Sequence, residues 1–497
     1  MKQLYISLHC KNHTASMEID FPDLDTSYPI HSRICESILD LFFRVSRQDS
    51  ISDYFPIEQS FRSTLRLISH GGGGEEDTYI DILGRITMFC RDVTRGKGER
   101  TASYALMCAW YDYDMRIFQY LFDLFIREYG GWKDAIGIAS YAESAHSNHP
   151  IIGFCVEKIN SQLRRDFMIK NGDSGCESNV AKWIPRENKK DGWLFYLLVD
   201  NWFSGSEGGS SSHQYKCYRK ICSMLTAQQP IGRVVRRINC ADSSRMVSEM
   251  QRITLSGSET NISRMAEMNS VWLRDEKYID TTTRGLQNII VVLDTGASMI
   301  ENRRLESAIG VACRIVNRSN CRRMITVGHL PAWISFPEKM EFSCMVQTVF
   351  ENIGVCGPKN IDKTFELLAH SCSESGMSDQ EIGELMVVYV SDMFVPDKDP
   401  DLNPGRNIHS IVSKAFSTGF NQLPHMVYWG IRPRESTPLP CEYNDPATTV
   451  VSGESAELMR IFNDESQGRT AYSNLHSFTR KYPFCSQHIS TSFSEYS

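Results

Sequence analysis

The sequence predicts a protein of two parts, an α-helical repeat region followed by a doubly wound α/β domain. The chain has 497 residues, which is too long for one ordinary hydrophobic core. From residue 79 to about residue 270, apolar side chains recur at helical spacing. After residue 283, short apolar runs that are typical of buried strands alternate with amphipathic helices. This alternation implies a largely parallel sheet that is covered by helices on both faces.

The first 77 residues show no pattern that assigns them to an element. They end near four consecutive glycines, residues 71–74, which the acidic residues 75–77 follow. A glycine run in a phosphate-binding loop is followed by Gly-Lys-Ser/Thr, and none follows here, so we predict a flexible joint. The predicted organisation is an unassigned region at 1–77, a helical module at 78–285, an α/β domain at 286–465 and a C-terminal tail at 466–497.

The helical module contains a series of amphipathic stripes. The first lies within residues 82–90, and the second, within 117–125, ends at Gly130 and Gly131. Because the predicted helices follow one another with short polar breaks, they favour paired helices stacked as a HEAT-like α-solenoid. Further helices are predicted at residues 151–169, 193–203, 213–225, 231–250 and 262–273.

The α/β domain is predicted from apolar runs that alternate with amphipathic segments. Its expected strands are residues 288–293, 321–327, 333–336, 385–390 and 426–429. Its expected helices are residues 304–316, 361–369 and 455–462. In parallel sheets of this kind, ligands bind beyond the carboxyl ends of the strands. Asp294 and Asp392 both stand at or directly after such strand ends, and they are the first candidate site.

Composition limits the classes of function. A hydrophobic content of 41% and a charged content of 23% are typical of globular proteins. The net charge of −7 gives no overall attraction to nucleic acid or to an acidic membrane, so binding to either needs a local basic patch. The sixteen cysteines form no CxxC pair, and no segment approaches 18 uninterrupted apolar residues. We therefore expect a cytoplasmic protein with reduced cysteines and no membrane association.

The strand-end residues resemble the metal-ion-dependent adhesion site of von Willebrand factor A domains. That site uses D-x-S-x-S, a distant threonine and a distant aspartate, which Asp294, Ser298 and Asp392 match in part. Gly296 stands in place of the first serine, and Lys359 stands where the threonine belongs. The resemblance implies Mg²⁺, but two lost hydroxyls and an added ammonium predict no tight binding, so we expect no cofactor. The two aspartates then serve as salt-bridge and loop-capping residues.

A second resemblance covers roughly residues 78–465. It is carried by ordered strings at residues 91–100, 129–134, 181–185, 218–220, 391–393, 427–432 and 451–453. In this order the strings are similar to a family of unknown function from eukaryotes and large viruses. That family is itself similar to the TROVE-plus-A-domain architecture of the Ro autoantigen. The resemblance implies a helical-repeat module joined to an A-type domain, RNA binding and no catalytic activity.

Two groups of basic residues are candidate RNA contacts. Arg95, Lys97 and Arg100 lie on a glycine-punctuated loop where backbone N–H groups can approach a phosphate. An equally supported interpretation is that Arg91, Asp92, Glu99 and Arg100 form a buried ion-pair network. The second group contains Lys182, Arg219 and Lys220, for which a solvated surface is the alternative. Its aromatic neighbours Trp183, Tyr215 and Tyr218 are suited to stacking on unpaired bases, and a packed corner is the alternative for Trp183.

The leading functional prediction is a non-enzymatic protein that binds RNA or a ribonucleoprotein. The alternative is a structural or scaffolding protein, such as a viral capsid or assembly component, that acts through protein partners or self-assembly and associates with virions. A metal-dependent adhesion module is a third class, which Gly296 and Lys359 count against. The sequence contains no GxSxG, HExxH or P-loop motif, so it does not predict an enzyme.

Overall fold

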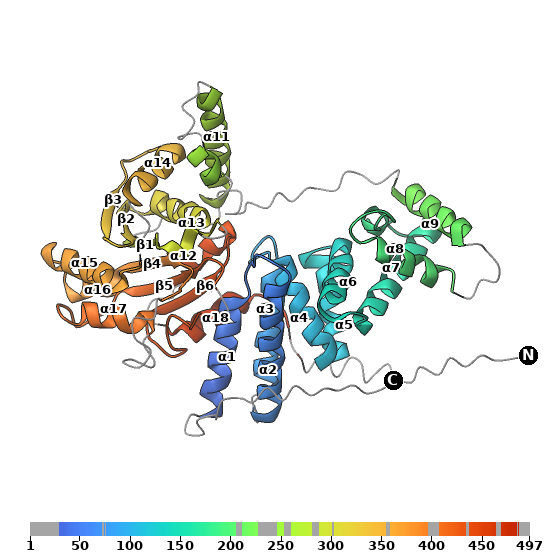
Figure 1. The fold of residues 1–497 in the computed structure, drawn as a ribbon. Helices are drawn as coiled ribbons and strands as arrows, with labels where there is room; N and C mark the ends of the chain where they lie inside the picture. The colour runs from blue at the N-terminus through green and yellow to red at the C-terminus, as the bar shows by residue number, and fades with distance from the viewer. Residues whose placement is uncertain are drawn as a thin grey trace, which may run out of the picture.

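The computed structural model describes residues 29–71, 74, 76–204, 211–226, 246–252, 260–280, 288–300, 303–353, 358–395, 407–433, 437–463, 469–484 and 486. Within these ranges the chain forms a helical region and then an α/β domain (Figure 1). The predicted order of a helical part followed by a largely parallel α/β part is therefore confirmed.

The helical region is an array in which each helix packs against its predecessors. Close pairs are α1 with α2, α2 with α4, α4 with α6, α6 with α7, and α7 with α8. The short turns η1 (Ser52–Tyr54), η3 (Phe125–Tyr129) and η4 (Val180–Trp183) connect some of them. The helices are α1 (Ile30–Arg44), α2 (Phe55–Gly71), α3 (Glu76–Arg91), α4 (Arg100–Tyr113), α5 (Met115–Leu124), α6 (Trp132–His146), α7 (Pro150–Lys170), α8 (Gly192–Trp202) and α9 (Ser211–Thr226).

Local sequence signals set several of these helix ends. The Asp114 carboxylate accepts hydrogen bonds from the first N–H groups of α5, and Pro150 opens α7 where a missing N–H is harmless. The helices predicted at 151–169, 193–203 and 213–225 correspond to α7, α8 and α9. The helix predicted at 231–250 falls mostly on residues 227–245, which lie outside the described ranges.

Two segments without a predicted element belong to the folded core. Within residues 1–77, α1 and α2 bury most of their apolar side chains, and α1 packs against the edge of the sheet. Within the predicted tail, α18 (Ala471–Thr479) packs against the same edge and against α3. Figure 1 shows α1, α3 and α18 between the sheet and the rest of the helical array.

The sheet has six strands in the order β3-β2-β1-β4-β5-β6. All neighbours are parallel except β3, which pairs antiparallel with β2. Because the strand order reverses at β1, the carboxyl ends of β1 and β4 flank the topological switch point of the sheet. The strands are β1 (Ile289–Asp294), β2 (Arg323–Val327), β3 (Ala332–Ser335), β4 (Met386–Ser391), β5 (His425–Gly430) and β6 (Thr448–Ser452).

The five predicted strands correspond to β1 to β5, and β6 is an additional strand. The segment predicted as a closing helix at 455–462 is instead the tighter 3-10 helix η6 (Ala456–Asn463). It begins just after Gly453, whose positive φ of 127° turns the chain away from β6.

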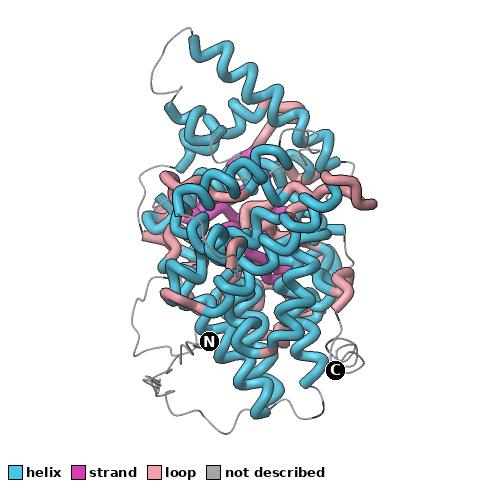
Figure 2. Tube along the Cα trace, turned by 90° about the vertical axis from the view of Figure 1, so that its right-hand side faces the viewer, coloured by secondary structure: helices cyan, strands magenta, loops and turns pink. Residues whose placement is uncertain are grey.

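Helices cover both faces of the sheet. Figure 1 shows α13 (Arg304–Arg318) and α14 (Phe342–Ile353) above the sheet, with α15 (Ile361–Glu374), α16 (Asp379–Glu384) and α17 (Ile408–Phe416) below it. In the perpendicular view, the strands are enclosed by helices (Figure 2). The short α12 (Ala297–Ile300) follows β1. Strands β1, β4, β5 and β6 are accordingly buried almost throughout.

Helix α11 (Thr260–Asp280) precedes the sheet and packs against helices that cover it. The Glu276 carboxylate pairs with Arg314 of α13 at 2.5 Å, and the Trp272 ring stacks on Phe342 of α14 at 3.8 Å between centroids. Residues 260–280, which sequence analysis places in the helical module, therefore contact the α/β domain.

Candidate nucleic-acid interface

The glycine-punctuated loop between α3 and α4 holds Lys97 in a buried position. Lys97 is 1% exposed, and its ammonium donates hydrogen bonds to the carbonyls of Phe42 and Val45 and to Ser452 Oγ. These bonds connect the end of α1 to the end of β6. Burial lowers the pKa of Lys97 to about 7. We call this arrangement the Lys97 clasp, and its contacts favour the structural interpretation of this residue over phosphate contact.

Ion pairs surround the Lys97 clasp. Arg47 lies 3.6 Å from the Glu99 carboxylate and 3.2 Å from the Glu454 carboxylate. Arg432 pairs with Glu454 at 2.7 Å and with Asp49 at 3.0 Å. The Glu454 side chain is fully buried, so these cations supply its charge compensation. The network fixes the helical region on the carboxyl ends of β5 and β6.

The other charged residues of the loop divide between buried and exposed positions. Arg91 pairs with Asp134 of α6 at 2.7 Å, and Asp92 accepts a hydrogen bond of 2.9 Å from Tyr482. Arg91 and Asp92 are both buried, in agreement with the predicted structural network. Their partners, Asp134 and Tyr482, however, lie outside the loop. Arg95 and Arg100 are exposed at the surface. Of the three predicted RNA contacts on this loop, these two are accessible.

A basic pocket lies between η4, the following loop and α9. It has a volume of about 500 Å³ and brings together Lys182 and Arg219, two of the residues predicted for RNA binding. Lys220 is exposed on α9 but does not line the pocket. The lining residues are Ala181, Lys182, Ile184, Pro185, Arg186, Glu187, Asn188, Lys189, Phe195, Arg219, Cys222, Ser223 and Thr226.

The charge of this pocket is strongly unbalanced. Among the described residues, four cationic side chains line it against one carboxylate, that of Glu187, which pairs with Arg219 at 2.8 Å. Three excess positive charges therefore surround one concavity in a chain whose net charge is −7. Arg186 and Lys189 were not predicted as RNA contacts, because only the turn after Pro185 brings them beside Lys182.

The aromatic residues predicted to stack on bases occupy different environments. Trp183 is half-buried, and the ammonium groups of Lys133 and Lys182 lie 5.1 Å and 5.4 Å from its ring centroid. Tyr218 is fully buried and donates a hydrogen bond of 2.8 Å to Asn160. Tyr215 is half-buried against Phe195. Only Trp183 combines partial exposure with adjacent cations.

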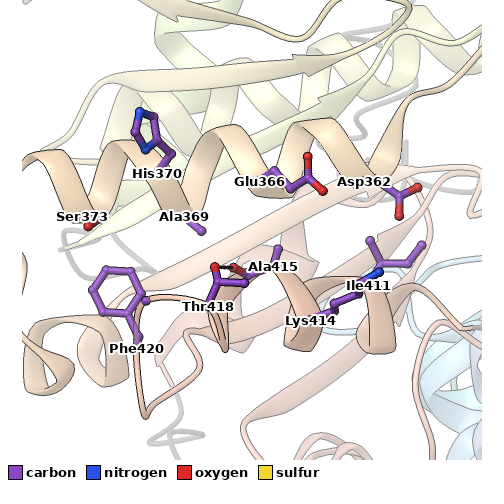
Figure 3. A pocket seen from close by; sticks show the side chains of 11 residues that line it. Asp362, Glu366, Ala369, His370, Ser373, Ile411, Lys414, Ala415, Thr418 and Phe420 are labelled. Carbon is purple, nitrogen blue, oxygen red and sulfur yellow. Dashed lines mark hydrogen bonds between the residues drawn. The ribbon is translucent and has the colours of Figure 1, made fainter.

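A second pocket, between α15 and α17, has the opposite electrostatic character (Figure 3). Its volume is about 300 Å³, and its walls carry Asp362, Glu366 and His370 from α15 and Lys414 from α17. Two carboxylates against one lysine repel a phosphate. Of these two pockets, only the one between η4 and α9 in the helical region has the charge to bind an anion.

At the carboxyl ends of β1 and β4, Lys359 lies between two buried aspartates. Its Nζ is 2.6 Å from Asp294 Oδ2 and 2.5 Å from Asp392 Oδ1, and it also donates to the carbonyl of Phe394 at 3.1 Å. Asp294 accepts a further hydrogen bond of 2.5 Å from Ser391. Burial raises the pKa of Asp294, whereas the adjacent Lys359 ammonium opposes that rise.

The residues around Lys359 do not fit a divalent cation at this position. The ammonium already contacts both carboxylates, so a metal ion there would meet a like charge at contact distance. A Cβ on Gly296 would lie 2.8 Å from Lys359 Cε, so the glycine leaves the space that the lysine side chain fills. Ser298 Oγ is buried and has no hydrogen-bond partner among the described residues.

Comparison with known proteins finds similarity to a family model and to individual proteins. Residues 288–481 match a family described as "Domain of unknown function (DUF7788)". An uncharacterized protein of Acanthamoeba polyphaga mimivirus is 21% identical over 507 residues, covering 89% of this chain and 84% of that protein. The crystal structure of the Deinococcus radiodurans Ro (RSR) protein is similar with a TM-score of 0.31 and 10% identity, covering 86% of this chain and 99% of that one. Among the described residues, no helix is both long and apolar enough to cross a membrane.

Proposed function

We propose that this protein binds RNA, alone or within a ribonucleoprotein, through the basic surface around the pocket between η4 and α9. The observation that carries the proposal is the convergence of Lys182, Arg186, Lys189 and Arg219 on one concavity. Contacts from Lys and Arg to phosphate supply most of the affinity in non-specific RNA and DNA binding. Four cations with one carboxylate provide that attraction locally, despite the acidic balance of the whole chain.

The surroundings of the pocket also suit RNA. Trp183 lies beside it with two lysines near its ring, and stacking on aromatic side chains is the common way to hold unpaired bases. Arg95 and Arg100 are exposed in the same helical region and extend the set of cationic groups. We propose no catalytic step for this surface.

For the C-terminal domain we propose an A-type fold whose ion site is permanently occupied by Lys359. The strand order with one antiparallel edge strand supports this assignment, as does the position of Asp294 and Asp392 at the switch point. In this proposal the ammonium replaces the charge of Mg²⁺. Any contact that this face makes would then be independent of divalent ions.

The test compares RNA binding of the wild type with a Lys182→Glu/Arg219→Glu variant of the full chain. We expect at least a tenfold loss of affinity for single-stranded RNA, because two phosphate contacts become repulsive. The matched control is Lys216→Glu/Lys220→Glu, which makes the same charge change on α9 outside the pocket lining. Equal losses in the two variants would indicate a diffuse electrostatic effect and contradict the assignment of this surface.

A structural or assembly role is the second candidate, and exposed apolar side chains favour it. The exposed fractions of Ile300, Leu330 and Phe394 are 52%, 75% and 36%. These residues follow the carboxyl ends of β1, β2 and β4 in the sequence. Protein contacts often use such apolar positions. Absence of RNA binding, together with self-association that Leu330→Asp abolishes, would support a scaffold or virion component instead.

A further inference from the structure

The pocket between η4 and α9 is lined by two kinds of side chain, cationic and apolar. The cationic side chains lie on η4, on the turn after Pro185 and near the middle of α9, whereas Phe195, Ile184 and Cys222 contribute apolar surface. Burial raises the pKa of Cys222 to about 12, so its thiol stays uncharged at neutral pH. A ligand that fills this pocket therefore needs an anionic group joined to a flat or apolar group.

The backbone of the turn that carries Arg186 and Lys189, and the side chain of Arg219, are held in place before any ligand arrives. The N–H of Lys189 donates to the carbonyl of Arg186 at 3.1 Å, and the N–H of Gly192 donates to the carbonyl of Lys189 at 2.9 Å. The Arg219 guanidinium is oriented by Glu187 at 2.8 Å. A Cβ on Gly192 would clash with the Glu187 carbonyl, so this tight turn requires glycine. Preorganisation of this kind lowers the entropic cost of binding an anion.

We propose that this pocket receives one nucleotide, with the base against Phe195 and Ile184 and the phosphate among Lys182, Lys189 and Arg219. The pocket volume of about 500 Å³ is within the range of small-molecule sites. An unpaired nucleotide of RNA and a free nucleoside monophosphate present the same chemistry. Binding of a nucleotide that is part of RNA rests on the proposed RNA binding, whereas binding of a free nucleoside monophosphate does not. A duplex keeps its bases stacked inside the helix and does not fill the pocket.

One face of α9 supplies both hydroxyls and charge to the site. Arg219, Ser223 and Thr226 are spaced by four and three residues, so they project from the same side of the helix into the pocket. Ser223 is exposed, and replacing it with tryptophan fills the pocket without changing any charge. Met224 is the adjacent position, is 37% exposed and does not line the pocket.

The experiment measures binding of AMP, adenosine, inorganic phosphate, a single-stranded oligoadenylate and a duplex RNA to the full chain by calorimetry. We expect AMP to bind at least tenfold more tightly than adenosine or phosphate alone. Ser223→Trp should weaken binding of AMP and of the oligoadenylate at least tenfold and leave duplex binding unchanged, whereas Met224→Trp should change none of them. In the unsubstituted protein, AMP should displace the oligoadenylate, and this measurement does not depend on how a variant folds.

The outcomes separate this inference from the proposed function. RNA binding without AMP binding or AMP competition would overturn the nucleotide pocket and leave the RNA-binding surface standing. AMP binding that Ser223→Trp abolishes, without any RNA binding, would support the pocket with a free nucleotide as its ligand and contradict the proposed function. AMP binding that is unaffected by Ser223→Trp would overturn the location of the site.

Discussion

At the residue scale, Lys359 and Gly296 form a matched pair in the strand-end site. The lysine supplies one positive charge to two carboxylates that are fully buried, and the glycine leaves the volume that the lysine side chain needs. A buried carboxylate without such a partner is strongly unfavourable. The pair explains why this site can exist without a metal ion.

Replacing Lys359 with methionine is expected to lower the free energy of unfolding by about 3–5 kcal/mol, because two buried carboxylates lose their counter-charge. Burial would then raise the pKa of Asp294 without the opposing Lys359 charge, so the folded variant would bind a proton that the unfolded chain has released. Its stability should therefore fall as pH rises above the ordinary aspartate range. Urea unfolding at about pH 5 and about pH 7.5 measures this.

The matched control is Lys363→Met, which removes an exposed lysine one turn into α15. We expect a change of less than about 0.5 kcal/mol for that variant. If the Lys359 and Lys363 variants have the same stability at both pH values, Lys359 does not compensate the charge of Asp294 and Asp392.

The sequence was informative about this site because both aspartates follow obvious apolar strands. It was less informative about Lys97, since its acceptors are Phe42, Val45 and Ser452, at sequence separations of 55, 52 and 355 residues. A glycine-flanked lysine has the same local pattern whether it contacts a phosphate or buried carbonyl groups. Only tertiary structure separates the two interpretations.

At the element scale, the Lys97 clasp joins α1, the loop after α3 and the end of β6. The carbonyls of Phe42 and Val45 and the hydroxyl of Ser452 accept hydrogen bonds from its ammonium, and these three acceptors are uncharged. Desolvation therefore dominates, and it lowers the pKa of Lys97 to about 7.

This pKa makes stability depend on pH with a definite sign. Between about pH 7 and pH 10.5, the unfolded chain binds a proton at Lys97 that the folded protein has released. Stability should therefore rise with pH in this window, by on the order of a few kcal/mol. The measurement is the difference in unfolding free energy between wild type and Lys97→Met at about pH 7 and about pH 9. If the unfolding free energy of the wild type relative to Lys97→Met is the same at about pH 9 as at about pH 7, or is smaller at about pH 9, Lys97 stays charged in the folded protein.

Element prediction succeeded where one periodicity dominated. β1 and β4 are continuous apolar runs, and α7 has a proline start and regular spacing. β6 was missed because the run from Thr448 to Ser452 contains three hydroxyl side chains, although β-branched residues fill four of its five positions. α1 and α18 were missed because their apolar faces are defined by each other and by β6, which lies far away in sequence.

At the scale of the whole molecule, the C-terminal segment returns to the helical region. After α18, Phe484 packs beside Tyr120 and Trp110, at centroid distances of 5.9 Å and 6.4 Å. A Cβ on Gly84 of α3 would clash with the Phe484 ring, so the glycine provides the space for it. The segment after α18 therefore stabilises the packing of α3, α4 and α5 in the helical region.

Phe484→Ala is expected to lower the free energy of unfolding by about 3–5 kcal/mol, because the ring is almost completely buried and leaves a cavity. Phe394→Ala provides the control, since that ring is 36% exposed and should cost less than about 1 kcal/mol. Chemical unfolding of both variants checks the prediction. Equal effects would mean that residues after α18 do not contribute to the folded core.

The central claim is that a local basic surface binds RNA in a chain that is acidic overall. The most direct measurement is the affinity for single-stranded RNA across about 50 to 300 mM salt, for the wild type and Lys182→Glu/Arg219→Glu. We predict that the logarithm of the association constant falls with the logarithm of salt concentration at a slope of roughly −2 to −3, and that the variant has a slope shallower by roughly 1 to 2. Affinity that is absent, or a slope that the variant does not change, would contradict the account.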